Sequence, residues 1–380
     1  MANAANIFVL IDGLGWEWVN SYPFLDSIAR YRRPLESVLG YSVGAIPSIL
    51  TGRFPEQHGR LTLFHRAMGE SPFESLRWAC SMPPALVENR YARHLVKRTA
   101  RYLNHFTGYF ILYGIPLNFL PFLDICEKSD IYKPGGIPGS RSIFDLLTER
   151  AKPYVAYSYH QGPDSELIKR MAKDLRRGGA DFYFLYLAGI DAFLHTFGDT
   201  DPEGTARSFK WYSDALAELY QIGRRSHGSA RIHIFSDHGM APTRRVADLQ
   251  RKIDALPSRQ PDDFLCLLDS TMARFWFFSS SARAQVMAAF DGDENGRWLT
   301  KSELTAMHAW FEDHRYGEEI YLMKEGTVIA PSHMGDIAAK GMHGFHPDSP
   351  HSRAVFLSSE DYGTGPAHIT DAFAVMRHSF

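Results

Sequence analysis

The sequence contains continuous apolar runs of strand length that are separated by longer segments of helical character. Residues 7–11 and 182–187 are two such runs, and residues 231–235 are a third that includes two basic positions. Apolar runs of this length suit strands of a parallel sheet that is buried on both faces. Their alternation with helical segments predicts an α/β fold with a doubly wound, mostly parallel sheet flanked by helices.

Side chains that can bind metal follow these runs. In open α/β sheets, functional groups gather beyond the carboxyl ends of the strands. Taken alone, an aspartate after a strand is usually a turn or cap residue, and a lone histidine is usually structural. Taken together, three carboxylates and three imidazoles suit zinc or a similar transition metal better than magnesium or calcium. The candidate metal ligands are Asp12, Asp191, His195, Asp237, His238 and His343. Six ligands are enough for two divalent ions, Zn²⁺ with Mn²⁺ as the alternative, each keeping an open position.

Ser42 is the candidate nucleophile. It begins residues 42–51, which predict a short helix that stops at Gly52. A serine at this place is ordinarily a helix cap. The unpaired backbone N–H groups of a helix start also attract phosphate. Beside two metal ions, the hydroxyl of Ser42 would become a nucleophile.

The order of these motifs resembles the alkaline phosphatase superfamily and, within it, the type I phosphodiesterase/nucleotide pyrophosphatase family. The motifs are Asp12-Gly13, Ser42 ten residues before Gly52, the segment 55–59, Asp191-x-x-x-His195, Asp237-His238-Gly239 and Met342-His343-Gly344. The resemblance implies an alkaline phosphatase-like fold with Ser42 as nucleophile. It also implies one zinc bound by Asp191, His195 and His343, and a second bound by Asp12, Asp237 and His238.

The sequence departs from the family pattern at two places. Most members have threonine where this chain has Ser42. The pyrophosphatases usually carry an asparagine soon after the His-Gly pair, and residues 60–65 contain none. Thr62 and His65 are therefore the candidates for contacting the phosphoryl group. A sulfatase is disfavoured because its signature does not follow Ser42.

Residues 102–123 contain no Asp, Glu, Lys or Arg and are rich in aromatic side chains, and they follow a basic stretch at residues 90–101. The length of the uncharged segment approaches that of a transmembrane helix, but glycines and prolines interrupt it. The alternatives are a buried cap that packs on the core, or a lid or peripheral surface that contacts lipid or an apolar substrate.

The chain is long enough for a large α/β core with insertions. Residues 1–60 and 141–380 are predicted to form the metal-binding catalytic core, and residues 61–140 an aromatic-rich cap inserted into it. Residues 245–335 are a candidate for a smaller subdomain within the core.

The composition limits the partners and the compartment. The formal net charge of −2 gives no reason to expect a nucleic acid polymer as partner. The three cysteines are widely spaced and odd in number, and the first six residues do not have the pattern of a signal peptide. These features favour a cytoplasmic location, with peripheral membrane contact as an addition if the aromatic segment meets lipid.

These observations predict a two-metal phosphoric ester hydrolase, in particular a phosphodiesterase or nucleotide pyrophosphatase that acts through a phosphoserine intermediate. Its substrate would be a small-molecule or lipid-like phosphoester. The alternatives within enzymes are a transferase of phosphoryl head groups and a phosphomonoesterase or phosphonate hydrolase acting on an apolar substrate. A non-catalytic binding protein that keeps the fold is the remaining alternative.

Overall fold

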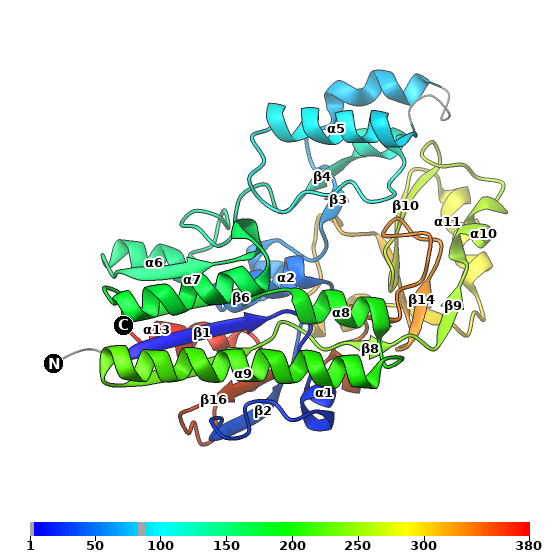
Figure 1. Cartoon of the computed structure of the whole chain (residues 1–380). Coiled ribbons are helices and arrows are strands. Elements are labelled where there is room, and N and C mark those ends of the chain that lie inside the picture. Colours follow the sequence, from blue (N-terminus) through cyan, green and yellow to red (C-terminus); the bar gives the residue numbers. More distant parts are fainter. Residues whose placement is uncertain (1–3, 83–87) are drawn as a thin grey trace. The chain divides into compact units, whose positions relative to one another are not determined.

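The computed structural model describes residues 4–82 and 88–380, which form two compact units built from interleaved stretches of chain (Figure 1). The first unit combines Met1–His58, Ile131–Pro242 and Ala339–Phe380, and the second combines Gly59–Asp130 and Thr243–Ala338. Residues 131–140, which the sequence places in the cap, thus belong to the first unit. Residues 243–338 group with residues 59–130 and not with the core.

The first unit is organised around a twisted sheet that has six strands in the described part of the chain, in the order β2-β16-β7-β1-β6-β5. The strands are β1 (Ala5–Ile11), β2 (Tyr31–Leu35), β5 (Tyr154–Tyr157), β6 (Phe182–Leu187), β7 (Ala230–Phe235) and β16 (Ala354–Ser358). β1 pairs in parallel with both β6 and β7, and β5 pairs in parallel with β6. β16 is antiparallel to β7 and β2. The predicted mostly parallel α/β sheet is therefore confirmed.

Helices cover both faces of this sheet (Figure 1). Ile7, Val9 and Ile11 of β1 pack into one apolar cluster with side chains of α1, α7 and α9, whereas Phe8 and Leu10 pack into another with α2, α6 and α13. Successive side chains of a strand point to opposite faces, so a strand that is apolar throughout can serve two cores. The helices of this unit are α1 (Trp16–Ser21), α2 (Ser42–Thr51), α3 (Pro55–His58), α6 (Ile143–Glu149), α7 (Asp164–Arg177), α8 (Gly189–Phe197), α9 (Pro202–His227) and α13 (Asp371–Arg377).

Short elements complete the first unit beyond the sheet. β8 (Ala241–Pro242) pairs with β15 (Gly341–Met342) in antiparallel fashion, and the single-turn 3-10 helices η3 (Tyr159–Gln161) and η4 (Pro350–Ser352) lie in connecting loops. The β8–β15 pair joins the chain just after His238 to the chain just before His343.

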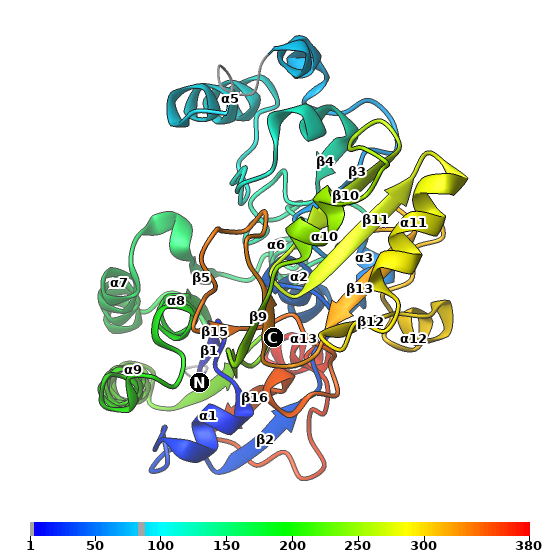
Figure 2. The same cartoon turned by 90° about the vertical axis from the view of Figure 1, so that its right-hand side faces the viewer.

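The second unit contains a separate antiparallel sheet, which within the described residues has four strands in the order β10-β11-β13-β12 (Figure 2). Phe290 of α11 packs on Phe275 of β11, with ring centroids 5.6 Å apart. The elements of this unit are β3 (Phe64–Arg66), η1 (Glu74–Ser81), α5 (Arg90–Leu103), η2 (Leu117–Phe122), β4 (Leu123–Ile125), β9 (Arg245–Ala247), α10 (Leu249–Asp254), β10 (Phe264–Leu268), β11 (Met272–Phe277), α11 (Ser280–Phe290), β12 (Gly296–Trp298), α12 (Lys301–Ala306), β13 (Glu319–Met323) and β14 (Thr327–Ile329).

The uncharged segment 102–123 begins with the exposed Tyr102 and Leu103, and from Phe106 onward many of its apolar side chains are buried inside the second unit. Phe110 contacts the rings of Phe73 and Phe106, and Phe119 contacts His333. Of the helices in the described ranges, none is long and apolar enough to cross a membrane. The segment therefore contributes to the core of the second unit, and the apolar side chains exposed near it lie mainly on α5.

Candidate active site

Asp12 lies at the carboxyl end of β1, where the chain turns through Gly13. The backbone of Gly13 has φ 69°, and a Cβ atom added there would lie 3.1 Å from Asp191, so glycine allows α8 to approach this turn closely. Asp12 Oδ2 accepts a hydrogen bond from the hydroxyl of Tyr186. Oδ1 lies 3.4 Å from Ser42 Oγ and 3.3 Å from His238 Nε2.

Asp237 and His238 follow the carboxyl end of β7, and both are buried. Asp237 Oδ1 accepts hydrogen bonds from the backbone N–H groups of Gly13 and His238, at 3.2 and 3.0 Å. Its Oδ2 lies 3.1 Å from His238 Nε2. His238 Nδ1 lies 2.9 Å from the carbonyl oxygen of Gly239. A proton on Nδ1 satisfies that carbonyl, so Nε2 is free to face Asp12, Asp237 and Ser42.

Asp191 and His195 lie one turn apart on α8, and His343 follows β15. His195 Nδ1 lies 2.8 Å from the carbonyl oxygen of Gly341, which directs Nε2 toward Asp191 Oδ1 at 3.3 Å. His343 Nε2 lies 3.7 Å from the same carboxylate oxygen. The rings of His343 and His238 stack with centroids 3.6 Å apart, so the two sets of side chains are adjacent.

The start of α8 is held by a carboxylate that the sequence analysis did not identify. Asp164 accepts hydrogen bonds from the backbone N–H groups of Ala188 and Gly189, at 3.3 and 2.8 Å, and from Tyr212 Oη at 2.5 Å. A carboxylate at a helix N-terminus satisfies orphan donors and complements the helix dipole. Asp164 therefore fixes the turn that carries Asp191.

Ser42 is the first residue of α2, and the residue before it, Tyr41, occupies the cap position. The expectation that Ser42 caps the helix is wrong, because Tyr41 takes the N-cap position and Ser42 lies inside the first turn. Ser42 Oγ instead lies 3.0 Å from His238 Nε2 and 3.4 Å from Asp12 Oδ1. The hydroxyl is thus directed at the carboxylate and imidazole cluster.

The electrostatics of the cluster fit bound cations. Burial, together with Asp237 and Asp191, raises the pKa of Asp12 well above its usual range. Burial alone would lower the pKa of His238, but Asp237 and Asp12 raise it to about 10. In the described part of the chain, no hydrogen bond reaches Asp191 Oδ1, Asp237 Oδ2 or His343 Nδ1. Carboxylates that repel one another and keep a buried oxygen without a hydrogen bond are stabilised by a positive ion.

The six candidate ligands form two groups whose potential ligand atoms lie within 4.8 Å of one another. One group is Asp191, His195 and His343, and the other is Asp12, Asp237 and His238. These are the same two sets that the resemblance implies. Each group could hold one metal ion, and the binding of metal by these residues stays a prediction.

Comparison with known families decides the class of the protein. Residues 6–346 match the family model described as type I phosphodiesterase/nucleotide pyrophosphatase. The chain belongs to this family. It is therefore a hydrolase that acts on phosphoester bonds, as the sequence motifs predicted.

Solved structures agree with this phosphodiesterase fold. Murine ectonucleotide pyrophosphatase/phosphodiesterase 5 is 15% identical, with a TM-score of 0.69 over 99% of this chain and 94% of that one. An inactive variant of the murine protein in complex with AMP is 17% identical, and the human protein is 15% identical. Both have a TM-score of 0.67 and the same coverage. A comparison with curated protein sequences found no match.

Thr62 and His65, the candidates for phosphoryl contact in this phosphodiesterase, lie in the second unit. Thr62 is buried and its hydroxyl donates a hydrogen bond to the carbonyl oxygen of Phe64 at 3.0 Å. His65 Nδ1 lies 2.9 Å from the carbonyl oxygen of Arg66, and burial lowers the pKa of the His65 ring. Their contact with substrate stays a prediction.

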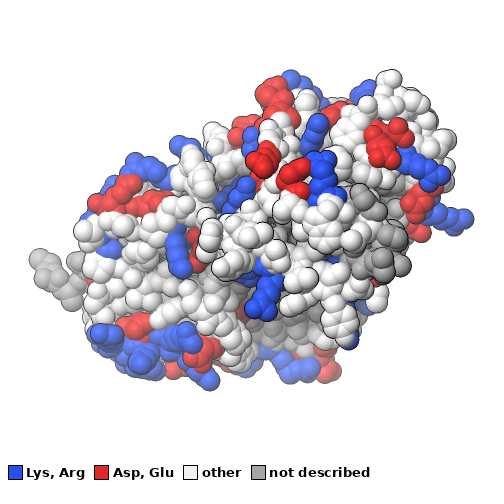
Figure 3. Space-filling model, turned by 90° about the horizontal axis from the view of Figure 1, so that it is seen from above, with Lys and Arg blue, Asp and Glu red and all other residues white. Residues whose placement is uncertain are grey.

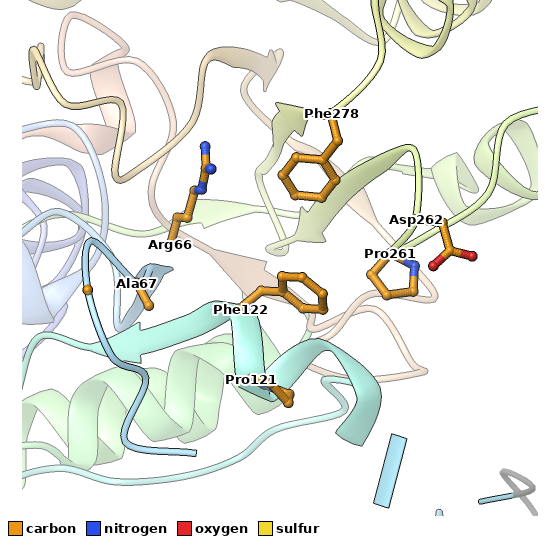
Figure 4. Close-up of a pocket in the computed structure, with 8 residues that line it drawn as sticks. Arg66, Ala67, Pro121, Phe122, Pro261, Asp262 and Phe278 are labelled. Atoms are coloured by element: carbon orange, nitrogen blue, oxygen red, sulfur yellow. The ribbon is translucent and has the colours of Figure 1, made fainter. Parts of the chain in front are cut away.

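A pocket of about 430 Å³ opens within the second unit, and it contains none of the predicted site residues. Figure 4 shows the rings of Phe122 and Phe278 between Arg66 on one side and Pro261 with Asp262 on the other. The two rings stack with centroids 6.2 Å apart, and the guanidinium carbon of Arg66 lies 5.5 Å from the centroid of Phe278. None of the residues that line this pocket belongs to the carboxylate and imidazole cluster.

Sequence reasoning missed two groups that support the phosphodiesterase cluster, Tyr186 and Asp164. In the sequence, Tyr186 is only a hydroxyl-bearing residue near the end of an apolar run. Its hydrogen bond to Asp12 depends on the pairing of β1 with β6, which sets Leu10 beside Tyr186. Asp164 is the first residue of α7. Its contact with α8, the next helix along the chain, depends on packing that spacing does not reveal.

Proposed function

We propose that this protein hydrolyses small-molecule phosphodiesters, with nucleotide-containing diesters first, through a phosphoserine formed on Ser42. The supporting observation is that Ser42 follows the cap residue of α2 and that its hydroxyl lies 3.0 Å from His238 and 3.4 Å from Asp12. Such a hydroxyl is available for nucleophilic attack, whereas a capping hydroxyl would be held by the backbone.

Asp12, Asp237 and His238 would hold one divalent cation, and Asp191, His195 and His343 would hold the other. We propose Zn²⁺ for both, with Mn²⁺ as the alternative, because the donors are mixed carboxylate and imidazole. Bound divalent ions lower the pKa of a nearby hydroxyl and neutralise charge on phosphoryl oxygens. The unsatisfied carboxylate oxygens of Asp191 and Asp237 support this assignment, since burial without a cation would be costly.

The residues of this chain divide the reaction between them. Ser42 Oγ attacks phosphorus, the bond to the leaving alcohol breaks, and the departing alcohol takes up a proton in exchange for the one that the serine hydroxyl gives up. Water then cleaves the bond between phosphorus and Ser42 Oγ, which restores the free serine. The N-terminal end of α2, whose helix dipole favours a negative charge, would face the phosphoryl oxygens during both displacements. His238 and Asp12 orient the hydroxyl of Ser42 for the first displacement.

The nucleotide assignment has a separate basis. A structural neighbour, the murine phosphodiesterase, is described in complex with AMP, and a nucleoside monophosphate is the product that a nucleotide diester would release. The rival outcomes are a phosphomonoester or phosphonate substrate, and transfer of the phosphoryl group to an alcohol instead of water. These alternatives would use the same metal ligands. They differ only in the groups bonded to phosphorus in the substrate and in the acceptor, water or an alcohol, that takes the phosphoryl group.

The test compares substrates before and after metal removal. An aryl ester of thymidine monophosphate, a bis-aryl phosphate and an aryl monophosphate are incubated with the purified protein, with the chelated protein, and with the chelated protein after return of Zn²⁺ or Mn²⁺. We expect the diesters to be preferred and activity to disappear on chelation and return with metal. Adding a primary alcohol and analysing products separates hydrolysis from transfer. Full activity in the stripped protein would contradict the two-metal mechanism.

Variants at Ser42 test the nucleophile. Ser42→Ala is expected to lower kcat at least about 10³-fold while metal content stays close to two ions per chain. Ser42→Thr is the matched control, because it keeps a hydroxyl at the same atom and is expected to retain measurable turnover. A Ser42→Ala protein that binds metal normally and hydrolyses the diester at the original rate would rule out phosphoserine.

A further inference from the structure

Helix α5 exposes large apolar side chains to solvent. Tyr91, Leu95, Tyr102 and Leu103 are 70%, 65%, 78% and 58% exposed. Scattered exposed apolar residues are ordinary, but several on one helix indicate a surface that another body covers. The same unit also exposes Met68, Trp78 and Met82 in the segment that precedes this helix.

Four of the exposed residues of α5 form one stripe. Tyr91, Leu95, Arg98 and Tyr102 follow the spacing i, i+4, i+7 and i+11, which keeps residues on a single helical face. All four are exposed, whereas Ala100 on the opposite side is buried. The apolar stripe is therefore the solvent side of a helix that is already packed on its other side.

The orientation of α5 is fixed by contacts within the second unit. Arg93 donates hydrogen bonds to the carbonyl oxygens of Ile115 at 2.9 Å and of Tyr113, and it forms an ion pair with Glu88 at 2.6 Å. The side chain of Asn89 caps the helix by accepting from two backbone N–H groups of its first turn. The stripe cannot turn inward without breaking these contacts.

The charge of α5 is entirely positive. The helix carries Arg90, Arg93, Lys97, Arg98 and Arg101 and no aspartate or glutamate. In the view from above, charged side chains of both signs occur on the face that carries α5, with uncharged surface between them (Figure 3). A helix with an apolar stripe, flanking arginines and interfacial tyrosines matches those that lie in the plane of an anionic bilayer.

We propose that α5 docks the second unit onto an anionic lipid surface. Tyr91, Leu95 and Tyr102 enter the boundary between head groups and acyl chains, where tyrosine is favoured because its ring is apolar and its hydroxyl is wet. Arg98, which lies within the stripe, and Arg101, which lies at its edge, pair with lipid phosphates. A nucleic acid would engage the arginines but leave the apolar stripe in water, so the lipid surface accounts for both features.

The test measures sedimentation of the full-length protein with vesicles. We expect binding to phosphatidylcholine vesicles that contain phosphatidylglycerol, weaker binding to phosphatidylcholine alone, and a fall in binding as salt concentration rises. Leu95→Glu combined with Tyr102→Glu is expected to lower the partition coefficient about tenfold or more, because the apolar insertion is lost. Arg98→Glu combined with Arg101→Glu is expected to lower binding to anionic vesicles only.

Trp211→Glu is the matched control, because Trp211 is a 44% exposed aromatic side chain on α9 in the first unit. It is expected to bind vesicles as the unaltered protein does. Turnover of a soluble diester should be the same in all variants, which shows that each is folded and separates this proposal from the proposed function. Thermal unfolding of each variant provides a second check of folding.

Three results would overturn the proposal. The first is equal or absent binding to neutral and anionic vesicles. The second is vesicle binding that falls as much in Trp211→Glu as in the variants of α5. The third is self-association, or binding to a single-stranded polynucleotide, that Leu95→Glu with Tyr102→Glu abolishes while vesicle binding persists.

Discussion

Replacing Tyr186 by phenylalanine would test how this phosphodiesterase presents Asp12 to a cation. The Tyr186 hydroxyl donates a hydrogen bond to Asp12 Oδ2, and both groups are buried. Oδ2 is therefore occupied, and Oδ1 is the oxygen that faces Ser42 and His238. The hydrogen bond selects one carboxylate oxygen and holds the carboxylate in one rotamer.

The size of the effect follows from the chemistry of this contact. A hydrogen bond to a charged group contributes about 1.5–3 kcal/mol. Since about 1.4 kcal/mol corresponds to a factor of ten, Tyr186→Phe should weaken metal binding by Asp12, Asp237 and His238 about 10- to 100-fold. The group made of Asp191, His195 and His343 should keep its affinity, because among the described residues no hydrogen bond joins Tyr186 to those three side chains.

The assay is competition for Zn²⁺ with a chromophoric chelator, which resolves two affinities in one titration. Tyr183→Phe is the matched control, because Tyr183 lies on the same strand and its hydroxyl lies 3.2 Å from His227 Nε2, away from Asp12. We expect Tyr183→Phe to leave both affinities unchanged. If Tyr186→Phe also binds both ions with unaltered affinity, the hydrogen bond does not position Asp12 and this reasoning fails.

Other residues give predictions of different kinds. Asp164→Ala removes the acceptor for the first N–H groups of α8, so zinc binding by Asp191, His195 and His343 should weaken and the free energy of unfolding should fall by about 1–2 kcal/mol. Burial raises the pKa of Glu127 to about 7, against an ordinary value of 4.5, although Arg60 partly offsets this. Because the pKa of Glu127 is higher in the folded than in the unfolded protein, its ionisation destabilises the fold as pH rises from about 4.5 to 7. Glu127→Gln should therefore raise the free energy of unfolding by up to about 3 kcal/mol at pH 8 and by almost nothing at pH 4. Burial, with Arg231, lowers the pKa of His233 to about 3, so stability should be lost as pH falls from about 6.5 toward 3, and His233→Gln should flatten that loss.

These predictions have separate controls. For Asp164, Asp174→Ala removes a carboxylate from the far end of the same helix and should leave zinc binding unchanged. An Asp164→Ala protein that binds two zinc ions normally would contradict the role assigned to that residue. For Glu127, a stabilisation that is equal at pH 4 and pH 8 would mean that ionisation is not the cause. For His233, an acid unfolding profile that the substitution leaves unaltered would refute the assignment. All three stabilities are measured by denaturant titration across the pH range.

The sheet of the first unit was predictable because its strands are buried on both faces. Residues 7–11 and 182–187 are apolar throughout, and in a chain with intervening helical segments this pattern is typical of parallel strands. The grouping of the metal-ligand candidates was implied by the resemblance to the phosphodiesterase family. The contacts of Tyr186 and Asp164 were not, because they depend on strand register and helix packing, which one sequence does not display.

The second unit was harder to predict because its two stretches are far apart along the chain. Residues 59–130 and 243–338 share no motif, and only their packing joins them. For the uncharged segment 102–123, the sequence did not decide between a buried cap and an exposed surface, since composition alone does not say which side chains face inward. The stripe on α5 is hidden in the sequence for a related reason. The stripe begins in the basic stretch 90–101 and ends in the uncharged segment 102–123, so neither segment contains all of it.

The path of the chain has a consequence for how this phosphodiesterase could diversify. The polypeptide leaves the first unit after His58 and after Pro242, and it returns at Ile131 and at Ala339. Every candidate metal ligand lies on a stretch that remains in the first unit. Genetic replacement of either excursion would therefore leave Ser42 and the six candidate metal ligands in place, so relatives could exchange these two segments and acquire new binding surfaces or new substrates on an unchanged set of metal ligands.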